Sequence, residues 1–212
     1  MIEELNTSKN VNGILLQLPV PEHLNTTRLI NAIDYRKDVD GLNPINVGKM
    51  VCQLPAMIPC TPLACLYLIK QVMSDLTGLN AIVIGRSNLV GRPLAQLLLQ
   101  EDCTVMQAHS KTKNLPELCR AADIVVSAVG KVGLIKRDMI KDGAIVIDVG
   151  INRLEDGKIT GDVLFLEMMD KAGYITPVPG GVGPMTIAML LWNVVRAAQG
   201  QFSDSKELVV LP

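Results

Sequence analysis

The sequence predicts an α/β protein built on a doubly wound, Rossmann-like parallel sheet. Between residues 79 and 151, short segments made almost entirely of Val, Ile and Ala alternate with segments of helical length. Strands that are apolar on both faces are typical of a parallel sheet covered by helices on both sides. The chain has 212 residues, of which 49% are hydrophobic and 19% charged, so it has enough apolar side chains for a sizeable core.

Four strands and two helices are predicted within this region. Apolar segments indicate strands at 80–84, 104–108, 124–129 and 144–149, and the segments between them indicate helices at 90–100 and 115–121. Ahead of the region, the pattern predicts a strand at 12–18 and a helix at 27–33. The segment KDVDGLNPINVGKM is rich in Asp, Gly, Pro and Asn, and it is therefore predicted to be a loop.

Two more helices are predicted, one on each side of the sheet region. Thr61 is placed to cap a helix that starts at Pro62 and continues to residue 69. Near the other end, TPVPGGVGP precedes a segment with apolar residues at 187, 190, 191, 194, 195 and 198. This spacing predicts a well-buried face of a helix, with Pro184 in its first turn. PVPGGVGP also has the composition of a stiff linker, but linkers are rarely followed by so apolar a helix.

The composition argues against several classes of partner. The 20 basic and 21 acidic side chains give a net charge of -1, which provides no basic face for a nucleic acid. No apolar stretch approaches the roughly 18 to 20 residues that cross a bilayer, and the N-terminus is unlike a signal peptide. We therefore expect a soluble protein. Five cysteines without a CxxC pair indicate free thiols in the reducing cytoplasm, and the separated His23 and His109 predict no metal site.

A glycine turn follows the first strand of the sheet region. The turn reads Gly85-Arg86-Ser87 and lacks the middle glycine of the common dinucleotide fingerprint, so by itself it is a weak signal. The next strand ends in HSKT, where an acidic residue would select NAD. Ser110 and Lys111, with Arg86, would instead bind a 2′-phosphate, which favours NADP. Each charge alone is read more simply as a solvated side chain, but both lie at loops that face the same ligand region.

Eight segments together resemble one enzyme family. They are GILLQLPVP, KDVDGLNPINVGKM, PCTP, GRSNLVGRP, HSKT, GAIVIDVGIN, GDV and TPVPGGVGPMT. In this order, from about residue 13 to about residue 198, they resemble the methylenetetrahydrofolate dehydrogenase/methenyltetrahydrofolate cyclohydrolase family. The PVPGGVGPMT and KDVDG segments are the most specific.

The resemblance implies an activity and a domain organisation. The family oxidises 5,10-methylenetetrahydrofolate to 5,10-methenyltetrahydrofolate with NADP, in one-carbon metabolism, and then hydrolyses the product to 10-formyltetrahydrofolate. By this resemblance, residues 1–62 form part of a folate-binding catalytic domain and residues 63–176 an NADP-binding domain. Residues 177–212 form a loop and a helix that return to the catalytic domain. The resemblance also implies a homodimer formed through the nucleotide-binding domain.

Site residues also follow from the resemblance. Five residues match cofactor-binding positions: Gly85, Arg86, Ser87, Ser110 and Ile151. Thr61 matches a position beside the nicotinamide. Gln17 and Asp40 match positions in the folate cleft, and the loop with Pro179, Gly180 and Gly181 matches the segment that closes it.

The chemistry of the two folate-cleft residues suits these roles. Asp40 can pair with the amino and ring nitrogens of a pterin through two hydrogen bonds, and Gln17 offers both a donor and an acceptor. From the residues alone, alternatives remain open. Gln17 fits the exposed face of a strand equally well. Asp38 and Asp40 fit a pair of metal ligands, or turn residues before Gly41, and spacing alone favours the turn.

One family segment has no match in this chain. Ahead of the GILLQLP strand, the family carries a tyrosine followed four residues later by a lysine, which is credited with activating the folate for hydrolysis. None of Tyr35, Tyr67 and Tyr174 has a lysine at that spacing. We therefore expect an N-terminally truncated chain, with apolar surface left without partners on the 12–18 strand and on the helix over residues 185–198.

We expect this polypeptide to bind NADP and to have absent or much reduced cyclohydrolase activity. Assays of both activities on the 212-residue chain would test this, and a full cyclohydrolase rate would contradict it. Two other functions remain open at this point: a non-catalytic nucleotide-binding or dimerisation module, and an NADP-dependent dehydrogenase of another substrate. Turnover of methylenetetrahydrofolate distinguishes an enzyme from a module.

Overall fold

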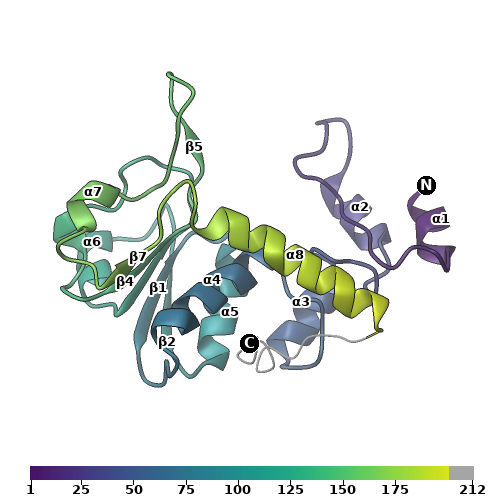
Figure 1. Cartoon of the computed structure of the whole chain (residues 1–212), viewed down its shortest axis with the longest axis horizontal. Coiled ribbons are helices and arrows are strands. Elements are labelled where there is room, and N and C mark those ends of the chain that lie inside the picture. Colours follow the sequence, from purple (N-terminus) through teal and green to yellow (C-terminus); the bar gives the residue numbers. More distant parts are fainter. Residues whose placement is uncertain (201–212) are drawn as a thin grey trace. The chain divides into compact units, whose positions relative to one another are not determined.

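The computed structural model describes residues 1–200, which fall into two compact units (Figure 1). Of the described residues, 1–60 and 187–200 form the first unit, and Thr61–Thr186 form the second. Two helices contain the boundaries between them: α4 (Cys60–Val72) begins with the last residue of the first segment, and α8 (Val182–Ala198) starts in the second unit and ends in the first.

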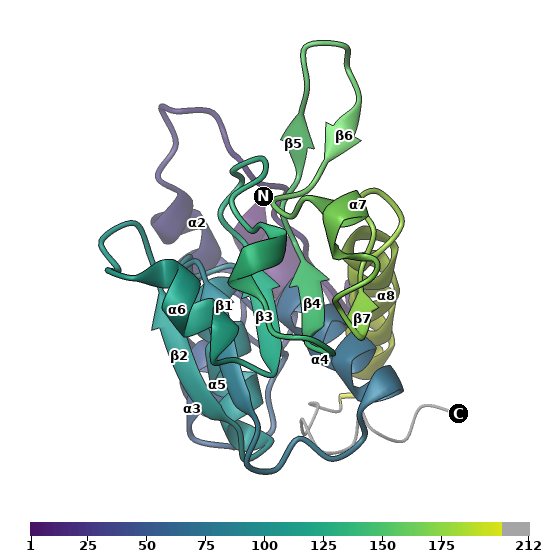
Figure 2. The same ribbon diagram turned by 90° about the vertical axis from the view of Figure 1, so that its left-hand side faces the viewer.

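The second unit contains the predicted parallel sheet, so the predicted fold class is confirmed. Its five strands lie in the order β2-β1-β3-β4-β7, and all four neighbouring pairs are parallel. The strands are β1 (Asn80–Ile84), β2 (Thr104–Ala108), β3 (Ile124–Ser127), β4 (Ile145–Asp148) and β7 (Tyr174–Ile175). From β1 the chain moves to β2 on one side and then to β3 on the other (Figure 2). The order therefore reverses at β1, the position where ligands bind to doubly wound sheets.

Helices cover both faces of this sheet (Figure 1). α5 (Gly91–Gln100) packs on β1 and β2. On the other face, α6 (Leu115–Arg120), a short 3-10 helix (Arg137–Met139) and α7 (Phe165–Met168) complete the layer. The core on this face contains Ile82, Ile84, Val125 and Val146 from the strands and Cys119, Met139 and Met168 from the helical segments. A small antiparallel hairpin of β5 (Asn152–Arg153) and β6 (Ile159–Thr160) follows β4.

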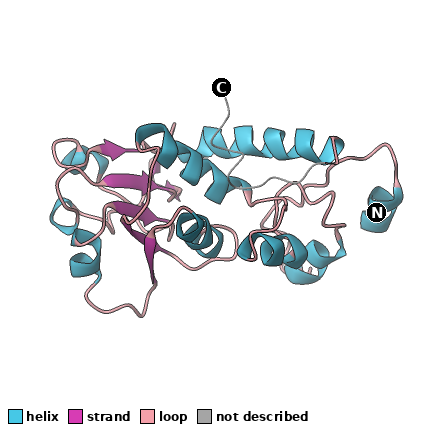
Figure 3. Ribbon diagram, turned by 90° about the horizontal axis from the view of Figure 1, so that it is seen from below, coloured by secondary structure: helices cyan, strands magenta, loops and turns pink. Residues whose placement is uncertain are grey.

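The described part of the first unit is helical and irregular, without strands (Figure 3). Its first helices are α1 (Ile2–Thr7), α2 (Thr26–Ala32) and α3 (Pro44–Val51). The helix predicted at 27–33 is confirmed as α2. The strand predicted at 12–18 is wrong, because an apolar segment becomes a strand only beside a hydrogen-bonded neighbour. Here only Ile14 forms a bridge, to Asp38.

Helix α3 lies inside the segment that was predicted to be a loop. The side chain of Asn43 accepts a hydrogen bond from the backbone N–H of Ile45 at 2.9 Å, and Pro44 occupies the first helical position. An asparagine cap followed by proline starts a helix as readily as it starts a turn. The loop prediction is therefore wrong over this part of the segment.

The prediction of a C-terminal helix is correct, but its predicted buried face is wrong. Ile187 and Leu191 are 63% and 62% exposed, whereas Met189 and Asn193 of the same helix are 2% and 0% exposed. The apolar stripe is present, but its side chains at 187, 191, 194 and 195 are exposed and are not covered by the rest of the first unit. Its exposure agrees with the expectation of unpartnered apolar surface on this helix. No helix within residues 1–200 combines the length and the apolar character needed to span a bilayer.

Candidate cofactor and substrate site

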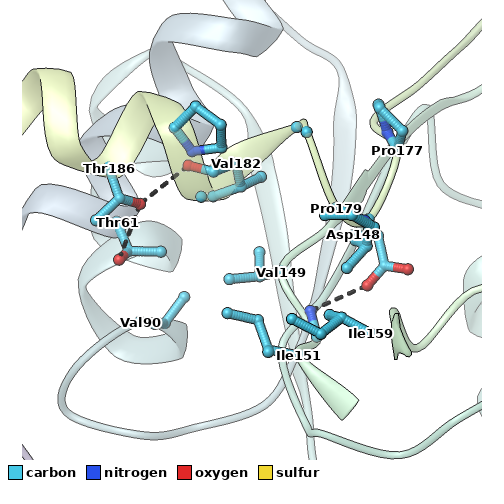
Figure 4. Close-up of a pocket in the computed structure, with 16 residues that line it drawn as sticks. Thr61, Val90, Asp148, Val149, Ile151, Ile159, Pro177, Pro179, Val182 and Thr186 are labelled. Carbon is cyan, nitrogen blue, oxygen red and sulfur yellow. Dashed lines mark hydrogen bonds between the residues drawn. The ribbon is translucent and has the colours of Figure 1, made fainter. Parts of the chain in front are cut away.

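A cavity of about 490 Å³ lies within the second unit, where β4 and β7 end (Figure 4). Its walls come from the end of β4 and the residues that follow it (148–151), from the 177–181 loop after β7, and from the first turns of α4 and α8. The predicted site residues Thr61, Ile151, Pro179, Gly180 and Gly181 all line it. The volume and the mostly apolar lining suit the ring-bearing end of a small ligand.

The polar groups at one end of this cavity are the hydroxyls of two threonines (Figure 4). The hydroxyl of Thr186 donates to Thr61 Oγ1, 3.2 Å away, and lies 3.1 Å from the carbonyl oxygen of Val182. Helix α4 begins at Cys60, so Thr61 lies in its first turn and is not the cap that was predicted. The first turns of the two helices are thus joined beside the cavity, and Thr61 faces it.

The glycine turn after β1 is set by close backbone approaches. Gly85 has a φ of +126°, and a Cβ at this position would lie 2.5 Å from the carbonyl oxygen of Ala128. A Cβ on Gly91 would lie 2.2 Å from the carbonyl oxygen of Gly85. Ser87 Oγ accepts a hydrogen bond from the backbone N–H of Val90 at 3.1 Å. The turn therefore lies close to the end of β3 and to the start of α5, and both glycines are needed there.

Arg86 and Ser110 lie at the same edge of the sheet. Ile84 of β1 pairs with Ala108 of β2, and each of the two residues follows two positions after this pair. Both side chains are exposed. In the loop after β2, the backbone N–H of His109 donates to Thr112 Oγ1 at 2.8 Å, which closes the turn. Because both residues are exposed, the hydroxyl of Ser110 and the guanidinium of Arg86 are accessible to an anion at that edge.

The two aspartates of the first unit have different surroundings. Asp38 is buried, and its Oδ2 accepts hydrogen bonds from Asn43 N at 2.7 Å and Asn46 Nδ2 at 3.0 Å. Asp40 is partly exposed, and burial raises its pKa to about 6, against the lowering effect of a hydrogen bond with Cys60. Asp38 thus holds the backbone, whereas Asp40 remains available to a ligand.

The structure agrees with the interpretation of Asp38 and Asp40 as turn residues before Gly41. The N–H of Gly41 donates to the carbonyl oxygen of Asp38 at 3.2 Å, so Asp40 lies in a turn. Within residues 1–200, no three His, Cys, Asp or Glu side chains are grouped to hold a metal ion. Gln17 is exposed, and its Nε2 donates to the carbonyl oxygen of Leu18 at 3.1 Å. Gln17 and Asp40 belong to the first unit, whereas every other predicted site residue belongs to the second.

Asn193 fixes the turn that carries Asp40, and the sequence analysis missed it. Its Nδ2 donates to the carbonyl oxygens of Val39 and Ile58, both at 2.9 Å, and its side chain is fully buried. Cys60 Sγ lies 3.4 Å from the same Val39 oxygen. The sequence did contain one signal, which is a single asparagine within the apolar segment LLWNVV. If such an amide is buried, it needs specific hydrogen-bond partners.

A doubly wound sheet with a cavity at its carboxyl edge defines the class of nucleotide-binding α/β proteins. Two family descriptions match the chain: "Tetrahydrofolate dehydrogenase/cyclohydrolase, NAD(P)-binding domain" over residues 59–202, and the catalytic domain of the same family over residues 1–40. The chain belongs to the tetrahydrofolate dehydrogenase/cyclohydrolase family, which confirms the resemblance seen in the sequence.

Individual relatives agree with this assignment. The "Bifunctional protein FolD" of Campylobacter concisus is 55% identical over 205 residues, which are 97% of this chain and 72% of the relative. The crystal structure of FolD from Campylobacter jejuni has 52% identity and a TM-score of 0.92, covering 93% of this chain and 71% of that one. FolD from Trypanosoma brucei, complexed with NADP cofactor and inhibitor, has 39% identity and a TM-score of 0.89, covering 93% and 70%.

Proposed function

We propose that this chain catalyses the NADP-dependent oxidation of 5,10-methylenetetrahydrofolate to 5,10-methenyltetrahydrofolate in one-carbon metabolism. The observation that carries the proposal is the placement of Arg86 and Ser110 at the edge of a sheet whose end also forms an apolar cavity. This sheet lies within the part of the chain that matches an NAD(P)-binding family domain. The second activity named for the family, cyclohydrolase, acts on the product of this oxidation.

The residues at the edge of the sheet fit NADP. Arg86 presents a planar set of N–H donors that matches a phosphate, and Ser110 adds a hydroxyl donor. Ser110 occupies the region after β2 where a carboxylate would repel the 2′-phosphate and bind the ribose of NAD instead. When bound, NADP supplies a hydride acceptor.

The cavity suits the reacting end of the cofactor. Val149, Ile151 and Pro179 give it apolar walls, which exclude water from a hydride transfer. The hydroxyl of Thr61 provides a polar contact for an amide group. Because hydride transfer needs little acid-base assistance from the protein, alignment of the two reactants is the main contribution of these residues.

Asp40 and Gln17 are proposed to act on the folate. When ionised, the Asp40 carboxylate accepts two hydrogen bonds from the amino group and ring nitrogen of the pterin, which orients the ring. Gln17 contributes a donor and an acceptor on an exposed side chain. The proposed domain roles follow: residues 1–62 for folate, 63–176 for NADP, and 177–212 as the returning loop and helix, of which 201–212 lie outside the described residues.

The assembly and location are also proposals. A homodimer through the nucleotide-binding domain is supported by exposed apolar side chains on the β5–β6 hairpin, Leu154 and Ile159. A cytoplasmic location is supported by the five free cysteines, of which Cys60, Cys65, Cys103 and Cys119 are buried.

The direct test is turnover. The 212-residue chain is expected to reduce NADP when methylenetetrahydrofolate is supplied, and the rate is followed by the absorbance of NADPH. NADP binding in a calorimetric titration without any turnover would instead identify a non-catalytic nucleotide-binding module. Turnover with NAD at the same catalytic efficiency would contradict the cofactor assignment.

A further inference from the structure

Asp162 is a buried carboxylate with an unusually large set of donors. Its side chain is fully buried, and both oxygens accept hydrogen bonds. The donors to Oδ2 are Ser127 Oγ at 2.9 Å, Val129 N at 2.9 Å and Gly130 N at 3.3 Å, and the donors to Oδ1 are Lys131 N at 2.7 Å and Asn152 Nδ2 at 3.0 Å.

These donors lie on two segments at the carboxyl edge of the sheet. Ser127 ends β3, and residues 129–131 form the turn that follows it. Asn152 begins β5, directly after the residues 148–151 that line the cavity. Figure 2 shows β5 next to the end of β4. Since the order of the sheet reverses at β1, the turn after β3 borders the crevice where such sheets bind nucleotides. One carboxylate therefore ties this turn to the wall of the cavity.

The segment that carries Asp162 is itself anchored by Asp148, which lines the cavity. Asp148 Oδ1 accepts from Asp162 N at 2.9 Å and Gly150 N at 3.0 Å, and Oδ2 accepts from Val163 N at 2.9 Å. Figure 4 draws one of these hydrogen bonds as a dashed line to the labelled Asp148. A Cβ on Gly161 would lie 1.8 Å from Asp148 Oδ2, so the two segments are in close contact. Movement of residue 162 is thus restricted from both sides.

Only an ionised carboxylate serves this set of donors. It offers about four lone-pair positions on two oxygens, whereas an amide offers acceptors on one oxygen only. A buried charge is retained only when such partners compensate for its lost hydration. The arrangement therefore does more than fill space, because an apolar side chain of the same size would leave three backbone N–H groups of one turn unpaired.

We propose that Asp162 is a positioning residue for cofactor binding, and that its carboxylate holds residues 129–131 and Asn152 in the arrangement that receives NADP. Asp162 itself does not line the cavity described above, so it acts through these neighbours. The inference rests on the proposed function, because it requires that the second unit binds NADP.

The test is a calorimetric titration of NADP into the 212-residue chain and its Asp162→Asn variant. The substitution keeps the size of the side chain but replaces one acceptor oxygen by a donor, which faces N–H groups of the turn. We expect the dissociation constant to rise about 10-fold or more, since each hydrogen bond to a buried charge has a large effect. A merely structural residue would lower the melting temperature and the fraction of binding-competent protein but leave the dissociation constant unchanged.

Two further variants sharpen the test. Asp156→Asn removes an exposed carboxylate from the same hairpin and is expected to leave the dissociation constant unchanged. The double variant D162N/N152D exchanges the two side chains, so that an amide at position 162 can donate to a carboxylate at position 152. We expect this variant to recover part of the lost affinity. An unchanged dissociation constant in Asp162→Asn, with normal binding by the unsubstituted chain, would overturn this inference alone. If the unsubstituted chain does not bind NADP, both the proposed function and this inference are wrong.

Discussion

Replacing Arg86 by alanine is expected to weaken NADP binding about 10- to 150-fold and to weaken NAD binding far less. The guanidinium is exposed at the end of β1, next to the loop that carries Ser110. A hydrogen bond to a charged group contributes about 1.5 to 3 kcal/mol, and only NADP carries the 2′-phosphate that receives it. Titration of the variant with each cofactor in turn measures the two losses.

Arg28→Ala is a matched control for Arg86→Ala. Arg28 is an exposed arginine on α2, in the first unit, so the variant has the same change in net charge. Its affinity for both cofactors is expected to be unchanged. Because the contact is at the surface, the difference between NADP and NAD should also shrink as the salt concentration rises. An equal loss for both cofactors in Arg86→Ala would show that the arginine does not bind the 2′-phosphate.

The central strands of the sheet could be predicted because β1, β3 and β4 are buried on both faces. The predicted strand at 80–84 has the bounds of β1, where consecutive Ala, Ile and Val residues leave little ambiguity. The predicted strand at 104–108 has the bounds of β2, although that strand also contains Thr, Met and Gln. The secondary structure of the first unit was harder to predict from the sequence. A strand depends on a neighbour that the local sequence does not reveal, and α3 depends on the Asn43 cap, which reads as a turn.

Helix α8 shows a second limit of sequence patterns. The periodicity of residues 187–198 correctly predicts a helix with an apolar stripe. It does not indicate which face the rest of the unit covers, and the buried residues Met189 and Asn193 lie on another face. Asn193 lies outside the apolar stripe, so the spacing of the stripe gives no sign that this residue is buried. Burial of a helix face depends on its neighbours, which periodicity alone cannot identify.

Some residues of the candidate site could be predicted from the sequence, and others could not. Arg86 and Ser110 could be placed together from the sequence, because paired parallel strands end at the same edge of a sheet. Asn193 and Asp162 could not, because their partners are distant in the sequence. Asn193 binds the carbonyl oxygen of Val39, 154 positions away, and Asp162 binds the end of β3 and the turn after it, 31 to 35 positions away. Hydrogen bonds to backbone atoms of distant segments leave no pattern in the local sequence.

Replacing Asp40 by asparagine is expected to lower kcat/KM for methylenetetrahydrofolate ~100-fold or more. Two hydrogen bonds from the pterin to a carboxylate contribute about 3 kcal/mol or more together, and an amide oxygen can accept only part of this set. Cofactor binding should be unchanged, because Asp40 lies in the first unit. Steady-state kinetics together with NADP titration separates the two effects.

The pH dependence gives this prediction a second readout. Burial raises the pKa of Asp40 to about 6, so the acid form, which cannot accept both hydrogen bonds, accumulates as the pH falls through this value. We expect kcat/KM of the unsubstituted chain to fall below about pH 6. In Asp40→Asn this decrease should disappear, because the titrating group has been removed. The control Glu22→Gln changes an exposed carboxylate of the same unit and should retain both the rate and the decrease. A low-pH decrease that persists in Asp40→Asn would assign the titration to another group and remove the support for a carboxylate–pterin contact.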